Sequence, residues 1–258
     1  MAFLSRRRGI LARLAVLELR LHTLTEELNA EPYRSDPESL LTTGRTGKVT
    51  LGFDAASRAD LSSAYAGFED VFRGSEAKVR ELLQPYPEMF NHHEPVVDVG
   101  CGRGEFLDLA AQAGISALGV DSDASMAERA RLKGHSVVCA DANEYLERLA
   151  DGSLGGIFSA QVIEHMAIDQ LRQLLGASYL KLRMGGIFLA ETVNPHSIQA
   201  AKVFWLDVTH RQPIFPEAML LLCRDSGFRK AEIFFPFGTG EFQYDRRHAD
   251  SYAVIAHK

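Results

Sequence analysis

Cysteine is scarce in this sequence, which contains only Cys101, Cys139 and Cys223. None of the three lies at the spacing of a metal-ligand pair, and an odd number does not suit a disulfide framework. Both a structural zinc site and a disulfide-stapled secreted domain are therefore disfavoured. Such sparse use of cysteine favours reduced thiols in a cytoplasmic protein.

Positive charge and long apolar runs are also lacking. The 28 Lys and Arg residues are outnumbered by 34 Asp and Glu residues, giving a formal net charge of -6. This balance offers no general attraction to nucleic acid or to anionic membrane, so we expect no nucleic-acid partner. The apolar stretch after Arg6-Arg7-Arg8 is interrupted by Arg13 and Glu18, so it predicts neither an export signal nor a transmembrane segment.

A leucine pattern marks residues 1–30, which we predict to form an N-terminal amphipathic helix. The apolar residues recur at alternating steps of three and four, and therefore align on one stripe of a helix. The run is shorter than the heptads that secure a coiled coil. It predicts docking on the chain's own domain or on a twin subunit, as in a homodimer; a membrane-surface helix led by the arginines is the alternative. The stripe consists of Leu14, Leu17, Leu21, Leu24 and Leu28.

Two segments follow this helix. Residues 31–61 contain Pro, Gly, Ser and Thr without apolar periodicity, and are expected to form a linker or loop. Residues 62–94 are predicted to be a helical lid segment. Gly74 and Ser75 should break its helix in two, because glycine costs about 1 kcal/mol in a helix interior. Residues 95–258 then form the main domain.

Short apolar runs alternate with stretches of helical length in the main domain. This alternation is typical of a parallel sheet covered by helices on both faces. The last two runs have no long helix between them, so one should run antiparallel at an edge. We predict a doubly wound α/β fold, with a mostly parallel seven-stranded sheet and an N-terminal helical extension. The predicted strands are residues 96–99, 117–120, 137–140, 156–160, 187–191, 231–235 and 251–256.

Three alternating glycines follow the first predicted strand, in Asp98-Val99-Gly100-Cys101-Gly102-Arg103-Gly104. Missing side chains let the backbone pass close to a ligand, and the next helix offers free N–H groups at its start. Dinucleotide-binding oxidoreductases use the longer spacing Gly-x-Gly-x-x-Gly. A carboxylate at Asp98 would serve a pyrophosphate poorly, whereas it would suit the ammonium group of an amino acid.

Acidic residues also end the next two strands. Asp121 lies about twenty residues past the glycine turn, where a carboxylate can accept hydrogen bonds from both hydroxyls of a ribose. Asp141, followed by Ala142, can accept from an adenine amino group. Helix capping is the alternative for any single Asp of this kind. Three acids at successive strand ends are harder to explain by capping, because open α/β sheets bind ligands there.

Together these features resemble the class I S-adenosylmethionine-dependent methyltransferases over about residues 95–258. Gly185-Gly186, at the fifth strand, fits the same pattern. The resemblance implies a Rossmann-like fold with strand order 3-2-1-4-5-7-6 and an antiparallel seventh strand. It also implies S-adenosylmethionine as cofactor, with the glycines under its methionine part. The cofactor-binding candidates are Asp98, Gly100, Gly102, Gly104, Asp121, Asp141, Ala142 and Gln161.

Five short motifs carry a narrower resemblance, at residues 72–75, 102–106, 162–165, 191–195 and 207–213. They are similar to motifs of bacterial sugar methyltransferases, such as O-antigen chain terminators and mycobacterial mannoside methyltransferases. This resemblance implies O-methylation of a sugar or oligosaccharide in polysaccharide biosynthesis. It also implies that the lid segment folds over the cofactor, which makes Tyr65 and Arg73 candidate contacts. An exposed helix arginine is the alternative for Arg73.

The expected reaction needs a base. Methyl transfer from a sulfonium is an in-line displacement, so the enzyme chiefly aligns the nucleophile. A sugar hydroxyl is a poor nucleophile at neutral pH, so a general base or a metal is expected. His165 and His210 are the candidate bases, with Glu164 orienting its neighbour; a structural role is the alternative for each. Glu164 and Asp207 can also hold a Mg²⁺ ion.

Polar and aromatic residues around the same segments are candidates for binding the acceptor. Carboxylates and amides bind sugar hydroxyls, and aromatic faces stack on sugar rings. Two rival functions stay open: methylation of a non-sugar small metabolite, and a scaffold that keeps a catalytically dead methyltransferase fold. The intact glycine and acid set argues against the scaffold. The acceptor candidates are Glu191, Asn194, His196, Trp205 and Asp207.

Overall fold

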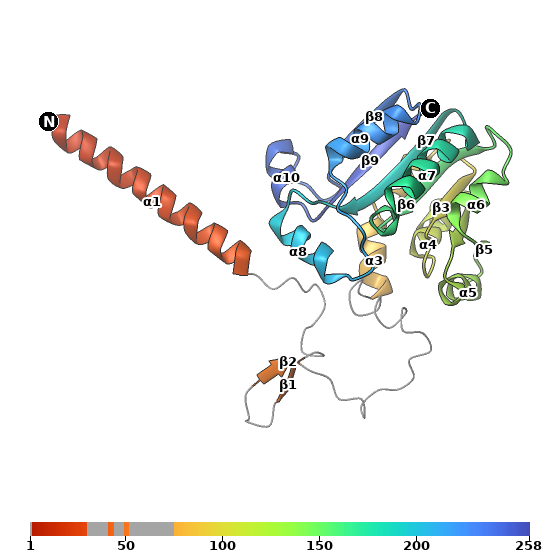
Figure 1. Cartoon of the computed structure of the whole chain (residues 1–258), viewed down its shortest axis with the longest axis horizontal. Helices are drawn as coiled ribbons and strands as arrows, with labels where there is room; N and C mark the ends of the chain where they lie inside the picture. The colour runs from red at the N-terminus through yellow and green to blue at the C-terminus, as the bar shows by residue number, and fades with distance from the viewer. Residues whose placement is uncertain (1, 30–40, 44–48, 52–74) are drawn as a thin grey trace.

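The structure, a computed structural model, describes residues 2–29, 41–43, 49–51 and 75–258 (Figure 1). Helix α1 (Ala2–Asn29) reaches the main domain at its carboxyl end, close to helix α8 (Ile198–Leu206), where Lys202 donates to the carbonyl of Leu28. Strands β1 (Leu41–Thr43) and β2 (Val49–Leu51) pair antiparallel. They interrupt the segment that was expected to be loop. Tyr65 and Arg73 lie outside the described residues, as does the first part of the lid segment.

The described part of the lid segment belongs to the core of the main domain. Ser75 caps helix α3 (Glu76–Leu83), because its Oγ accepts from Lys78 N at 3.3 Å. A 3-10 helix, η3 (Pro87–Phe90), follows. Tyr86 and Phe90 are fully buried beside Phe158 of the sheet, with ring centroids 5.1 and 5.9 Å from it. The chain leading into the sheet is therefore anchored by aromatic packing.

The main domain is built on a seven-stranded sheet in the order β5-β4-β3-β6-β7-β9-β8. Counted along the main domain, this is the predicted order 3-2-1-4-5-7-6, so the fold class is confirmed. The expectation of an antiparallel strand at an edge, which rested on the apolar runs alone, is wrong. The antiparallel strand β9 does not lie at an edge, since it pairs with β7 on one side and β8 on the other. The strands are β3 (Val96–Val99), β4 (Ala117–Asp121), β5 (Val137–Cys139), β6 (Leu154–Ala160), β7 (Leu182–Val193), β8 (Lys230–Phe234) and β9 (Ser251–His257).

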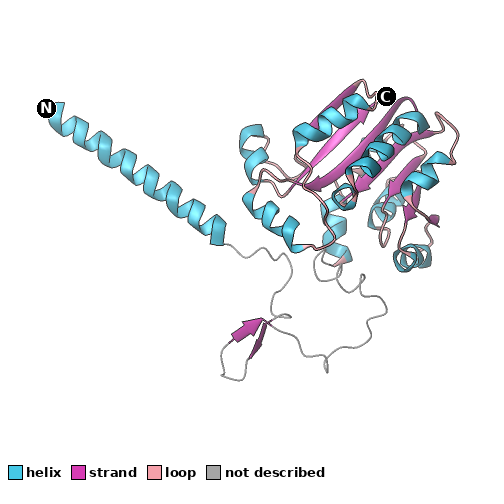
Figure 2. Ribbon diagram, in the orientation of Figure 1, coloured by secondary structure: helices cyan, strands magenta, loops and turns pink. Residues whose placement is uncertain are grey.

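Helices cover both faces of this sheet (Figure 2). One face packs on residues of α6 (Ala142–Glu147), α7 (Ile168–Lys181) and α9 (Pro216–Asp225). The other packs on α3 and α4 (Glu105–Gln112). The remaining elements are α5 (Ala124–Leu132), η4 (Ile163–His165) and α10 (Phe242–His248).

Burial on both faces explains the apolar runs in the sequence, because a strand covered on two sides has no solvent-facing positions. Every residue of β3 and of β6 is buried. Among the described residues, no helix has the length and apolar character of a membrane-spanning segment.

Candidate functional site

The turn after β3 is built from left-handed glycines. Gly100, Gly102 and Gly104 have φ values of +71°, +52° and +84°, which residues with a Cβ rarely adopt. At Gly100 a Cβ would also lie 2.3 Å from Val162 Cγ2, so the segment that enters η4 packs directly on the turn. The missing side chain at Gly100 thus brings two loops together at the carboxyl ends of β3 and β6.

The predicted ribose ligand, Asp121, holds this turn in place. Its Oδ2 accepts from Gly102 N at 2.8 Å, and its Oδ1 accepts from Asp123 N at 2.8 Å. Each carboxylate oxygen has two lone pairs, so it can accept more than one hydrogen bond. The carboxylate therefore joins the glycine turn after β3 to the loop after β4.

Asp141 caps a helix, which is the alternative role considered above for an aspartate at a strand end. Its Oδ1 accepts from Asn143 N at 2.9 Å and from Glu144 N at 3.1 Å, at the start of α6. Its Oδ2 takes no part in the cap. The capping role and the predicted contact with adenine are therefore compatible, with one oxygen for each, and Ala142 opens the helix beside them.

A small cavity lies between the glycine turn and helix α3. Asp98, 2% exposed at the end of β3, puts a carboxylate on its wall. A buried carboxylate suits the ammonium group of a methionine moiety, and Asp121 suits a ribose. The residues present therefore fit S-adenosylmethionine. The cavity is lined by Leu83, Asp98, Gly100, Cys101, Glu105, Phe106, Phe158 and Ala160.

A buried ion pair inside the turn was not predicted from the sequence. Arg103 Nε lies 2.6 Å from Glu105 Oε1, with side chains 3% and 2% exposed. A buried charge is tolerated only when it is paired, so this contact fixes the turn to the first residue of α4. The sequence does place opposite charges two residues apart at Arg103 and Glu105. We used these residues only as part of the motif at 102–106 and did not predict that they pair.

Glu191, which stays a predicted acceptor ligand, joins three segments of the chain. Its Oε2 accepts from Tyr86 Oη at 2.5 Å, and its Oε1 accepts from Gln161 Nε2 at 3.2 Å. Burial raises the pKa of Tyr86, and the adjacent Glu191 carboxylate raises it further. Gln161 itself has a left-handed φ of +56° and donates its backbone N–H to the Glu191 carbonyl. This network ties the lid segment to the ends of β6 and β7.

The predicted catalytic residues meet at the carboxyl end of β6. Glu164 and His165 come from η4, and His210 comes from the loop after α8. The two imidazole rings are 4.6 Å apart, and one ligand atom from each of the three residues lies within 4.8 Å of the others. Arg211 N donates to the Glu164 carbonyl at 2.9 Å, which pins the loop to η4.

A hydrogen-bonded chain sets the tautomer of His165. The Thr209 hydroxyl donates to Asp207 Oδ1 at 2.6 Å, so its oxygen must accept from His165 Nδ1, which lies 2.9 Å away. Nδ1 therefore carries a proton, and the neutral ring has its lone pair on Nε2. Thr209 was not predicted, because its hydroxyl acts through a contact 44 residues away in sequence.

His210 is held in a comparable way. Its Nδ1 lies 2.7 Å from the Phe204 carbonyl, which can only accept, and its ring stacks on Phe204 at 4.6 Å. Phe204 is buried, as expected for a core residue. His210 Nε2 lies 3.6 Å from Asp207 Oδ2. His210 thus lies beside Asp207, the first residue of the hydrogen-bonded series Asp207–Thr209–His165 that orients His165.

The donor set does not fit the predicted Mg²⁺ ion. Mg²⁺ prefers an octahedral set of oxygen ligands, whereas the cluster around Glu164 supplies two imidazoles and one carboxylate. Asp207 is not part of that cluster, and its Oδ1 already accepts from the backbone N–H and hydroxyl of Thr209.

Three acceptor candidates have different surroundings. Asn194 is fully buried: its amide donates to the carbonyls of Arg246 and Ala249 and accepts from His196 N, so it supports the backbone rather than offering groups to a sugar. His196 Nε2 lies 3.0 Å from Glu217 in a half-exposed cluster. Trp205 on α8 is 69% exposed and adjoins Phe204. Of these three, only the indole presents a broad free face.

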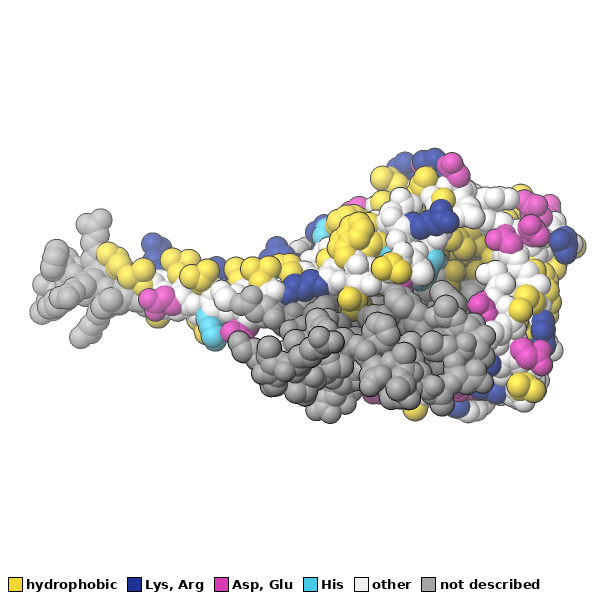
Figure 3. All heavy atoms as spheres, turned by 60° about the horizontal axis from the view of Figure 1, so that its bottom comes forward, with side chains coloured by type: hydrophobic (Ala, Val, Ile, Leu, Met, Phe, Trp, Pro, Cys, Tyr) yellow, Lys and Arg dark blue, Asp and Glu magenta, His cyan; other side chains and the backbone are white. Residues whose placement is uncertain are grey.

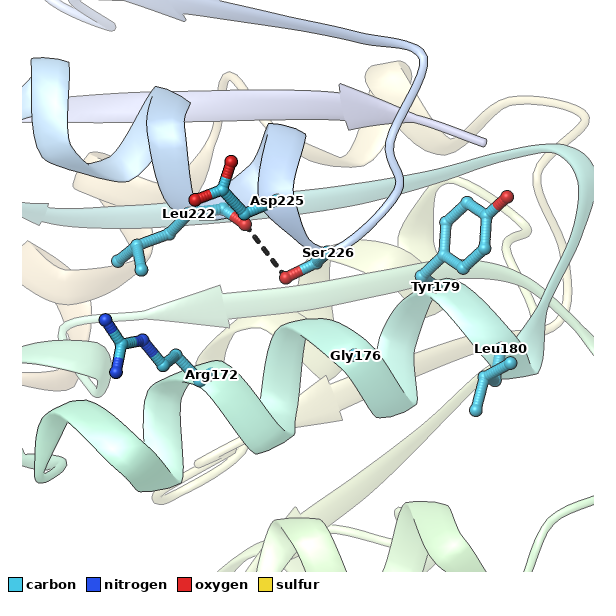
Figure 4. A pocket seen from close by; sticks show the side chains of 7 residues that line it. All are labelled: Arg172, Gly176, Tyr179, Leu180, Leu222, Asp225 and Ser226. Atoms are coloured by element: carbon cyan, nitrogen blue, oxygen red, sulfur yellow. Dashed lines mark hydrogen bonds between the residues drawn. The ribbon is translucent and has the colours of Figure 1, made fainter.

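A further pocket lies between α7 and α9, away from this cluster (Figure 4). Its lining residues lie on α7 between Arg172 and Leu180 and at the end of α9, and none of them belongs to the cluster of Glu164, His165 and His210. Ser226 Oγ closes one side by donating to Leu222 O at 2.8 Å. This pocket therefore does not belong to the candidate site.

Comparisons with known proteins agree with this geometry. Residues 97–190 match the family model described as a methyltransferase domain. A solved S-adenosylmethionine-dependent methyltransferase from Archaeoglobus fulgidus is 31% identical, with a TM-score of 0.69 over 76% of this chain and 100% of its own. A protein of Mycolicibacterium smegmatis described as a probable S-adenosylmethionine-dependent methyltransferase is 29% identical over 60% of each chain. The match thus spans about three fifths of that relative's length.

More distant structures share the fold alone. A phosphoethanolamine N-methyltransferase of Haemonchus contortus, solved with S-adenosylhomocysteine, is 16% identical with a TM-score of 0.53, over 76% of this chain and 60% of its own. The sheet order, the glycine turn with its strand-end acids and the relative of more than 30% identity point the same way. The chain belongs to the class I S-adenosylmethionine-dependent methyltransferases, and it is an enzyme of that family.

Proposed function

We propose that this enzyme is an O-methyltransferase whose acceptor is a hydroxyl of a sugar or oligosaccharide, such as a mannoside in polysaccharide biosynthesis. The observation that carries the proposal is the chain from Asp207 through Thr209 to His165. A hydroxyl must lose a proton when it is methylated, so it needs a general base. A neutral amine attacks with its own lone pair and has less need of such an arrangement.

His165 is the general base in this proposal. Its Nε2 lone pair accepts the proton of the acceptor hydroxyl as the oxygen attacks, and the resulting imidazolium is stabilised by the Asp207 carboxylate through Thr209. His210 and Glu164 then act as positioning residues that hold η4 and the following loop together. The proton later leaves His165 for solvent, which restores the neutral ring.

The cofactor side of the site is assigned to the glycine turn and the strand-end acids. Bound S-adenosylmethionine supplies a sulfonium-linked methyl group, and transfer forms a C–O bond while the S–C bond breaks to leave S-adenosylhomocysteine. Asp98 would hold the ammonium group, Asp121 the ribose hydroxyls, and Asp141 the adenine amino group. Tyr65 and Arg73 stay predictions as lid contacts. A Mg²⁺ requirement is not part of this proposal, because the donor set does not suit that ion.

Two observations support a sugar as acceptor. Trp205 exposes its indole beside Phe204, on which His210 stacks, and the His210 ring lies 4.6 Å from the ring of the proposed base, His165. Indole faces pack on the apolar faces of sugar rings. The resemblance of five short motifs to sugar methyltransferases points to the same acceptor. We also propose a cytoplasmic location, based on the sparse cysteines.

The direct test is methyl transfer from labelled S-adenosylmethionine to a panel of acceptors. The panel comprises mannose oligosaccharides, glucose oligosaccharides, a hydroxylated aromatic metabolite and a small primary amine. We expect label on the mannose oligosaccharides, with the product resistant to mild base as an ether. Label only on the aromatic hydroxyl would replace the sugar by a non-sugar metabolite. Label only on the amine would overturn O-methylation.

Replacing Thr209 by valine tests the proposed base through its positioning residue. Valine has the same shape but no hydroxyl, so the His165 tautomer loses its partner. Losing one such hydrogen bond costs about 1–1.5 kcal/mol, which corresponds to roughly a tenfold fall in kcat with KM little changed. Steady-state kinetics on the acceptor identified above provide the measurement.

Thr209→Ser is the matched control, because it keeps the hydroxyl and loses only a methyl group. We expect its kcat to stay within about twofold of wild type. Equal losses in both variants would mean that Thr209 acts through packing, and the relay would be abandoned.

A further inference from the structure

Helix α1 exposes the apolar stripe that the sequence places on it. Ile10 extends the stripe of five leucines by one position, and these six residues are between 47% and 66% exposed, although leucine and isoleucine are usually buried. Figure 3 shows hydrophobic side chains following one another along the described part of this helix, beyond the main domain. An exposed apolar stripe of this length marks an interaction surface. The six residues are Ile10, Leu14, Leu17, Leu21, Leu24 and Leu28.

The stripe has the spacing of a two-helix seam. Leu14, Leu21 and Leu28 occupy a positions of a heptad, and the other three stripe residues occupy d positions. A helix rises 1.5 Å per residue, so the stripe runs for roughly 27 Å. α1 meets the main domain near its carboxyl end, through Leu28 and Lys202, which leaves the rest of the seam facing outward.

Charges beside the seam indicate that the helix packing on it is α1 of a second copy, running parallel. Arg13 and Arg20 lie at g positions, and Glu18 lies at an e position. In a parallel in-register pair, a g residue faces the e residue of the next heptad, so Arg13 of each copy meets Glu18 of the other. In a fully overlapping antiparallel pair, Arg20 would face Arg20 and Glu18 would face Glu18. Arg13 would face Glu27 in that antiparallel pair, but the contacts between like charges would remain, so only the parallel pair combines complementary charges with no such contact.

We propose that α1 is a dimerisation helix, which forms a parallel two-stranded coiled coil with α1 of a second copy. This inference does not depend on the acceptor or on the catalytic base, because the stripe lies outside the site. Its consequence is that both main domains lie at the same end of the coiled coil.

Sedimentation equilibrium of the full chain tests the association. We expect a mass of about twice 28.5 kDa at micromolar concentration, and about 28.5 kDa for Leu17→Asp and for Leu21→Asp. Thr23→Asp is the matched control, because it adds the same charge to an exposed c position of the same helix. It should stay dimeric. Binding of S-adenosylhomocysteine should be unchanged in every variant, which shows that the main domain remains folded.

A charge exchange tests the orientation. Arg13→Glu should weaken the dimer about fivefold, because it places two like-charge pairs beside the seam. Arg13→Glu combined with Glu18→Arg should restore the wild-type dissociation constant in a parallel pair. In an antiparallel pair the same combination would not restore the dimer, because the glutamate introduced at position 13 would still face Glu27 and position 18 would still face a like charge.

Four outcomes would overturn the proposal. They are a monomeric wild type at tens of micromolar, a mass above two copies, a dimer that survives both leucine substitutions, and a double variant that is no tighter than Arg13→Glu alone. Vesicles of anionic phospholipid provide a parallel assay. Binding of a monomer to them through α1 would assign the stripe to a membrane surface instead.

Discussion

His165→Ala is expected to lower kcat by roughly 10²–10⁴-fold, because general-base catalysis of this kind typically contributes that much. The variant loses the lone pair that we propose as acceptor of the hydroxyl proton, while the residues on β3 and β4 that are proposed to bind the cofactor are untouched. Binding of S-adenosylhomocysteine should therefore stay within about twofold of wild type. The measurement is single-turnover methyl transfer with saturating cofactor, compared with calorimetric binding on the same preparation.

His248→Ala is the control, since this histidine is exposed on α10, away from η4. We expect no change in its turnover. His210→Ala should lose less activity than His165→Ala, because the His210 ring acts by packing on Phe204 and on the chain around Asp207. If His210→Ala stopped turnover while His165→Ala left it intact, the roles of the two histidines would be exchanged.

Asp121→Ala is expected to weaken S-adenosylhomocysteine binding by at least about 100-fold. A hydrogen bond to a charged group contributes about 1.5–3 kcal/mol, and this carboxylate is assigned two of them from the ribose. The substitution also frees Gly102 N, which the carboxylate holds at 2.8 Å, so the glycine turn loses a support. Isothermal titration calorimetry measures the effect.

Asp123→Ser is the matched control for this experiment. Asp123 lies two residues further on and caps α5 through Ser125 N and Met126 N, a task that serine also performs. Its cofactor affinity should stay within about threefold of wild type. If Asp121→Ala kept full affinity at an unchanged unfolding temperature, the ribose assignment would be wrong. The acids at the strand ends would then serve only as turn and helix caps.

The strands of the sheet could be predicted because each leaves a local signal in the sequence. Strands buried on both faces read as continuous apolar runs, and all seven were found, although β6 begins at Leu154 and β7 extends from Leu182 to Val193. The order of the strands came from the resemblance, since apolar runs carry no information about their neighbours. The apolar runs alone suggested an antiparallel strand at an edge, whereas the order implied by the resemblance placed β9 correctly between β7 and β8.

The parts of the site that were missed depend on long-range contacts. Tyr86 meets Glu191 across 105 residues, and Thr209 meets His165 across 44. Nothing in the local sequence distinguishes that tyrosine or that threonine from others. Asn194 shows the converse problem. Its place after a strand end is typical of a ligand-binding amide, but three backbone partners in the fold already satisfy it.

The position of β9 has a consequence for how the molecule folds. In the sheet β8 pairs with β9 alone, and β9 comes later in the chain, after α10. During synthesis β8 therefore has no partner strand in this sheet until α10 and β9 have been made. The edge of β7 that β9 will cover stays open for the same interval. An open strand edge is a site of aggregation, so the nascent chain should depend on chaperones most strongly at this stage.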